Sequence, residues 1–207
     1  DTGHRLVGER LVGDNAWGFG RLASARRHLE RAVALYDPAA HRALALDYVY
    51  DQRVVARDLL TCTLFVLGYP EQAEAQVRLA VAEAEALRHR ASLAHALAFA
   101  GMLAQLRDDA AGVLGPASAV RRLAEEQAIP FWAGLATVLE GWAMGREGSP
   151  DAGTATILRA LDALHSTGVR LWRPYHLGLL ADVEAHASLY DQALARVVAA
   201  FRQVEDT

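Results

Sequence analysis

The sequence contains no lysine, a single cysteine and only two isoleucines among its 207 residues. One cysteine, Cys62, excludes an internal disulfide, and we expect it to be a small buried core residue. Without lysine the chain has no Walker-type phosphate loop, whose lysine contacts the phosphates. The arginines that replace lysine alternate with acidic residues and form no basic stripe, so nucleic acid is excluded as a predicted partner.

Long apolar segments are missing too. The longest, at residues 59–67, is interrupted by threonines and is too short to cross a bilayer. No secretory signal is visible. We therefore expect no membrane partner and a cytoplasmic location. Helical sequence begins almost at once after Asp1, which suggests an excised piece of a larger protein.

Alanine, by contrast, makes up about a fifth of the residues, and the chain is 53% hydrophobic. Alanine is the best helix former and lets helices approach closely. Because β-branched and aromatic strand formers are scarce, the composition predicts an all-α fold.

One turn recurs along the chain. At Leu67–Pro70, Gly68 suits the left-handed end of a helix and Pro70 the first turn of the next. The small, large and small residues Ala73, Val77 and Ala80 then follow on one helix face. Similar turns centre on Gly20, Gly68, Arg107, Gly148 and Ser188, which lie 48, 39, 41 and 40 residues apart. A period of this size is typical of a solenoid.

The turns predict five antiparallel helical hairpins in one repeat domain covering 1–207. We place the hairpins at residues 3–38, 54–88, 91–127, 131–166 and 171–205. Residues 39–53 are less regular and either extend a helix or form a loop with a short helical turn. In the third hairpin Gly112, Pro116 and Ala119 take the small, large and small positions, so that helix is expected to start late or to kink. The segments Ile129–Trp132 and Val169–Trp172 match one repeat apart.

The pattern resembles the tetratricopeptide repeat (TPR), first in Ala25, Leu29 and Ala32. The stretches Ala25–Pro38, Leu67–Ala73, Glu125–Trp132 and Leu171–Tyr175 resemble TPR-like regions of large bacterial regulators. Those regulators join a class III adenylate/guanylate cyclase or a LuxR-type domain to a STAND/AAA-like ATPase. The resemblance implies an α-solenoid in a right-handed superhelix, whose concave groove is lined by the first helix of each hairpin. It also implies a sensor or scaffold arm.

Catalytic motifs are missing. The histidines have no metal-ligand spacing, and His28, His41, His165 and His186 are expected to be exposed or half-exposed. No nucleophile elbow occurs. We therefore expect no enzyme activity, metal or cofactor in this segment, although the parent protein could carry cyclase or ATPase domains.

The expected function is a non-catalytic interaction or sensor module. Its groove would bind a protein or peptide, including other domains of the same chain, or a small effector. The candidate groove residues are Asp58, Phe65, Trp132, Trp142, Arg146, Trp172, Arg173, Tyr175 and His176. Two alternatives stay open. In the first, Trp132 and Trp172 serve merely to fill the gap between hairpins and bind nothing. In the second, the chain is a structural self-assembly arm without a ligand. The last helix, through Phe201 and Val204, would expose apolar surface unless more repeats follow.

Overall fold

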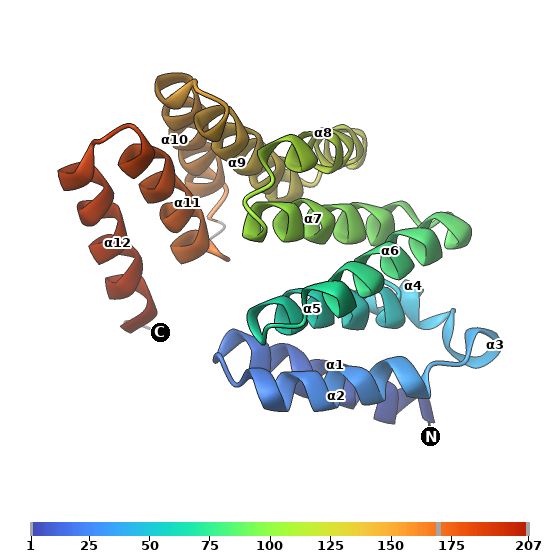
Figure 1. Ribbon diagram of the computed structural model, residues 1–207. Coiled ribbons are helices and arrows are strands. Elements are labelled where there is room, and N and C mark those ends of the chain that lie inside the picture. The colour runs from blue at the N-terminus through green and yellow to red at the C-terminus, as the bar shows by residue number, and fades with distance from the viewer. Residues whose placement is uncertain (1, 169–170, 206–207) are drawn as a thin grey trace. The chain divides into compact units, whose positions relative to one another are not determined.

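The computed structural model describes residues 2–168 and 171–205, and every regular element in these ranges is a helix (Figure 1). This confirms the all-α prediction. The helices are α1 (Thr2–Gly18), α2 (Leu22–Leu35), α3 (Pro38–His41), α4 (Leu44–Tyr48), α5 (Gln52–Val66), α6 (Pro70–Leu87), α7 (Arg90–Leu106), α8 (Ala110–Gln127), α9 (Pro130–Arg146), α10 (Pro150–Ser166), α11 (Arg173–His186) and α12 (Tyr190–Glu205). No helix in the described part of the chain is long and apolar enough to cross a membrane.

The chain divides into two compact units, Asp1–Leu106 and Arg107–Thr207. In the first unit α1 packs on α2 and α5 on α6, and α7 covers both α5 and α6. In the second, α9 lies between α8 and α10, while α11 contacts α9, α10 and α12. Helices that follow one another in sequence therefore pack in adjacent pairs. The single repeat domain, the solenoid and its handedness stay predictions.

The predicted turns share one backbone feature, a residue with positive φ just after a helix. Gly68, Asp108, Gly148 and Ser188 have φ values of 84°, 57°, 94° and 63°, and each follows the last by 40 residues. At the first of these, the amide of Gly68 donates to the carbonyl of Phe65 and that of Tyr69 to Leu64. These bonds satisfy carbonyls that the helix end leaves open. The third turn therefore centres on Asp108, one residue later than Arg107.

The same one-residue shift corrects the prediction for α8. This helix begins at Ala110, where the Asp109 side chain accepts from the amide of Gly112, and it continues through Pro116. It does not start late. The residues buried on its inner face are Val113, Ala117 and Val120, not Gly112, Pro116 and Ala119. They lie 40 residues from Ala73, Val77 and Ala80, which are all buried as predicted.

Small residues let α9 and α10 approach at backbone distance. A Cβ added to Gly153 would lie 2.5 Å from the carbonyl oxygen of Gly141 and 2.8 Å from the amide nitrogen of Gly145. No side chain fits between backbone atoms at such distances. Glycine at 153 therefore fixes how closely these two helices pack.

The irregular segment between α2 and α5 holds two short helices, α3 and α4. It ends at Asp51, a buried residue whose carboxylate accepts from the amides of Arg53 and Val54 and caps α5. The same carboxylate accepts from the Tyr36 hydroxyl, while the Asp51 amide donates to Ser92 Oγ. His41, expected to be exposed or half-exposed, is instead buried, and its Nδ1 accepts a hydrogen bond from the Asp37 amide.

Candidate binding surface

In the first unit, Asp58 is fully buried on α5 and pairs with His95 of α7. Its Oδ2 lies 2.7 Å from His95 Nδ1, and the imidazole stacks on the Phe99 ring at 4.8 Å. Burial raises the pKa of Asp58 to about 6, although the hydrogen bond to His95 opposes this shift. Asp58 Oδ1 has no hydrogen-bond partner among the described residues.

Polar side chains of α1 extend this pair. Arg10 Nε donates to Gln52 Oε1 at 3.1 Å, and Arg10 Nη1 contacts Asp14 at 3.4 Å. Burial raises the pKa of Asp14, and the charges of Arg10 and His95 oppose that shift. The first helices of three hairpins, α1, α5 and α7, thus contribute to one polar cluster. Phe65, also predicted on this surface, is half-buried in the last turn of α5.

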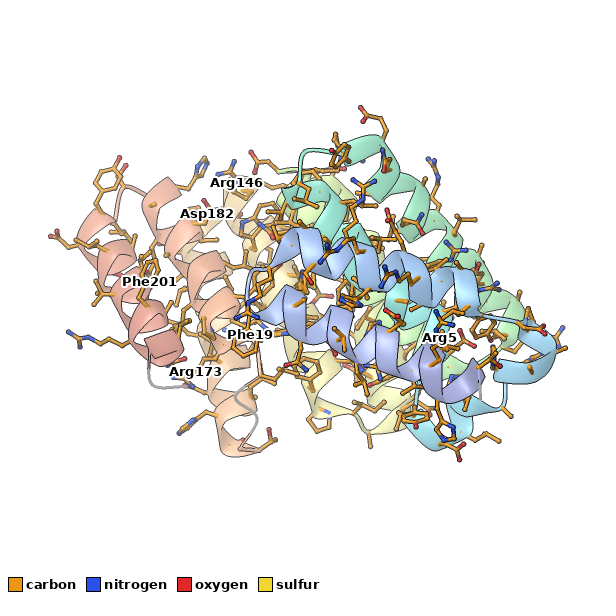
Figure 2. The ribbon with its side chains drawn as sticks, turned by 90° about the horizontal axis from the view of Figure 1, so that it is seen from below. Arg5, Phe19, Arg146, Arg173, Asp182 and Phe201 are labelled. Atoms are coloured by element: carbon orange, nitrogen blue, oxygen red, sulfur yellow. The ribbon has the colours of Figure 1, made fainter. Side chains whose placement is uncertain are left out.

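In the second unit, Trp142 and Arg146 of α9 both reach Asp182 of α11. The indole Nε1 of the buried Trp142 donates to Asp182 Oδ2 at 2.7 Å. Arg146 lies 2.5 Å from Asp108 and 3.9 Å from Asp182, and Figure 2 shows Arg146 beside Asp182. Arg146 therefore links the turn before α8 to α11, across the end of α9.

An aromatic cluster forms where α9 and α11 begin. The Phe131 ring lies 4.8 Å from Trp132 and 5.4 Å from Trp172, and the two tryptophan rings are 6.1 Å apart. All three contacts are edge-to-face, a favourable geometry for aromatic rings. Trp132 is buried, whereas Phe131 and Trp172 keep part of their surface in solvent. Trp172 has φ 59° and immediately precedes α11.

Two nitrogen atoms in the first turn of α11 are buried without a hydrogen-bond partner in the described part of the chain, Arg173 Nε and His176 Nε2. Burial, together with the charge of Arg173, lowers the pKa of His176 to about 4. His176 is therefore neutral at pH 7. The Tyr175 ring lies 5.9 Å from its imidazole and is half-exposed. Arg173 Nε can donate to an acceptor oxygen, whereas Nε2 of the neutral His176 donates or accepts according to its tautomer.

The structure distributes the predicted residues between the two units. Asp58, Trp132, Trp142 and His176 are buried, and the other five are half-buried. In the second unit it brings together Trp142 with Arg146, and Trp132 with Trp172. The sequence did not predict the pairing of Asp58 with His95. The feature that could have indicated this pairing is a polar residue in the apolar part of each of the two helices, α5 and α7. Val169 and Arg170 of the predicted matching loops lie outside the described residues.

The described residues hold no group of three or more histidine, cysteine or acidic side chains that could bind a metal ion. No protein-family model matches the chain, and no curated protein matches it.

Proposed function

We propose that the chain is a non-catalytic interaction module that binds a partner polypeptide on the first helices of its hairpins. In the second unit the binding surface is the start of α9 and α11, with Phe131, Trp172, Arg173, Tyr175 and His176. The observation that carries this proposal is the pair of unpartnered nitrogens, Arg173 Nε and His176 Nε2, with the half-exposed Tyr175 ring 5.9 Å from the His176 imidazole.

The chemistry of these groups favours a peptide carbonyl or carboxylate oxygen. A buried donor without a partner costs free energy, which an incoming acceptor recovers. Aromatic and arginine side chains also contribute most to binding at protein interfaces. A small effector with the same acceptor group would use the same contacts. In this proposal the module is the sensor arm of a bacterial signalling or transcriptional regulator of the kind it resembles.

Selection of random peptides displayed on phage against the purified chain tests the proposal. Selected peptides should quench or shift tryptophan fluorescence, and Trp172→Ala and Arg173→Gln should each weaken their binding about tenfold or more. The control is Tyr69→Ala, which removes an exposed aromatic ring from the other unit. If no peptide is enriched, or if the control weakens binding as much as the other two variants, the proposal is wrong.

A further inference from the structure

Helix α12 presents a continuous apolar stripe to solvent. Its members are spaced alternately by four and three residues and are all exposed: Tyr190, Leu194, Val197, Phe201 and Val204. This spacing is the repeat of a coiled-coil seam, which packs one helix along another. Single exposed apolar residues are ordinary, but an aligned set on one helix marks an interaction surface.

The corresponding positions of α10, 40 residues earlier, show what such residues do when covered. Ile157, Leu161 and Leu164 are buried there, where α10 packs against α9 and α11. Their counterparts on α12 are Val197, Phe201 and Val204, and Phe201 is 65% exposed. The residues on α12 are as apolar as those on α10, so this face has the composition of a packed helix face.

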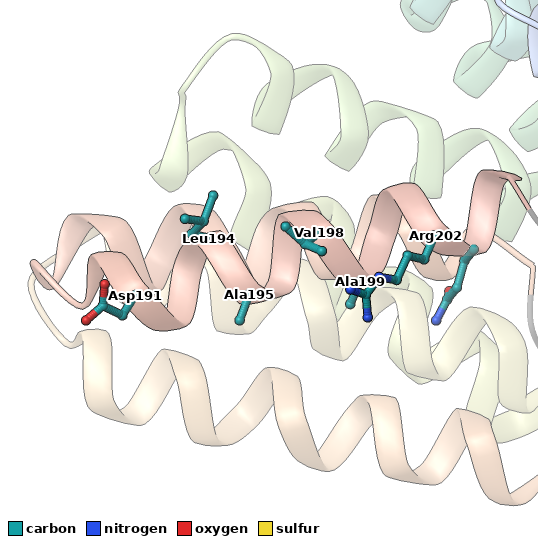
Figure 3. A pocket seen from close by; sticks show the side chains of 7 residues that line it. Asp191, Leu194, Ala195, Val198, Ala199 and Arg202 are labelled. Carbon is teal, nitrogen blue, oxygen red and sulfur yellow. The ribbon is translucent and has the colours of Figure 1, made fainter.

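Charges beside the stripe indicate the orientation of a partner helix. A shallow hollow along α12 is lined by Asp191, Leu194, Ala195, Val198, Ala199, Arg202 and Gln203 (Figure 3). Asp191 and Arg202 are eleven residues apart, which is close to three helical turns and puts them on the same side. The acidic group is at the first turn and the basic group near the last.

We propose that this face binds the same face of a second copy of the chain, with the two α12 helices antiparallel. A two-fold axis between Arg196 and Val197 then places Asp191 of each copy at the level of Arg202 of the other, and Tyr190 between Phe201 and Val204. A parallel pair would instead place like charges at the same level, which disfavours it. The interface is self-complementary, as a two-fold dimer requires.

Sedimentation velocity over a concentration series measures the association. The wild-type chain should dimerise, and Phe201→Ser should raise the dissociation constant about tenfold or more. Phe19→Ser is the matched control, because Phe19 is the same residue type, is 74% exposed and lies in the other unit. A wild-type chain that stays monomeric at its solubility limit, or equal effects of the two variants, would overturn the proposal.

Charge exchange tests the antiparallel pairing with variants that leave the apolar stripe intact. Asp191→Arg and Arg202→Asp should each weaken self-association, because each places like charges together. An equimolar mixture of the two variants should form heterodimers, since every facing pair is then opposite in sign. The double variant should dimerise like the wild type. If the mixture associates no better than either single variant, the antiparallel pairing is wrong. Sedimentation reads dimerisation and tryptophan fluorescence reads peptide binding, so the two proposals can fail independently.

Discussion

Lowering the pH should destabilise the second unit through His176. This side chain is 1% exposed, and its burial lowers the pKa to about 4 from the ordinary 6.5. The unfolded chain therefore takes up a proton as the pH falls through 6.5, whereas the folded chain does so only near pH 4. The stabilising contribution is complete above 6.5 and is lost between 6.5 and 4. One pKa unit corresponds to about 1.4 kcal/mol, so the loss reaches about 2 kcal/mol at pH 5 and about 3 kcal/mol at pH 4.

Urea unfolding of the wild type and of His176→Leu, at intervals from pH 7.5 to 4.5, measures this contribution. Leucine is similar in volume and cannot be protonated. The free energy of unfolding of the wild type relative to this variant should fall by about 2 kcal/mol between pH 7.5 and 5. His165→Gln, at an exposed position of α10, controls for the removal of an imidazole. If the curves of the wild type and His176→Leu stay parallel, His176 is not held neutral by burial and the argument fails.

Three further predictions concern stability and reactivity. Gly153→Ala should lower the free energy of unfolding by about 1 to 3 kcal/mol, because the added Cβ would meet backbone atoms of α9. Gly178→Ala, which has open space around its Cα, should raise the free energy of unfolding by about 0.5 to 1 kcal/mol. Chemical denaturation measures both variants. Trp142→Phe should cost about 1 to 2 kcal/mol through the lost bond to Asp182, and Asp182→Asn less, because it keeps an acceptor. Burial raises the pKa of Cys62 to about 12, so Ellman's reagent at pH 8 should label it only as fast as the chain opens, and rapid labelling of the native chain would contradict its burial.

Much of the fold follows from local patterns. Alanine content and the glycine turns predicted helices that pack in consecutive pairs, and the structure confirms them. The error in the third hairpin came from aligning on Gly112 and Pro116, the residues that look like helix breakers. The actual turn uses Asp108, a residue that also tolerates positive φ, and Pro116 is accommodated inside the helix. Aligning the repeats by residue type alone therefore placed the inner face of α8 one residue too early.

The candidate site was less predictable, because it depends on which side of each helix is covered. An aromatic or polar residue on a first helix can serve the core or the surface, and the sequence does not separate these roles. Trp142 is an example: its ring is buried, yet its indole N–H reaches the half-exposed Asp182. The pairing of Asp58 with His95 depends on the packing of α5 against α7 and on their relative rotation, which no local pattern encodes.

The position of Asp51 bears on how the length of this chain could change in evolution. One buried carboxylate holds the end of α2, through Tyr36, and the start of α5 at a fixed separation. The connecting segment between Tyr36 and Asp51 therefore begins and ends at fixed positions. Insertions and deletions in this segment would then change only its own length, without changing the spacing of the hairpins on either side. The longer first interval between turns is what such an insertion would leave behind, and this stretch is where related chains are expected to differ most in length.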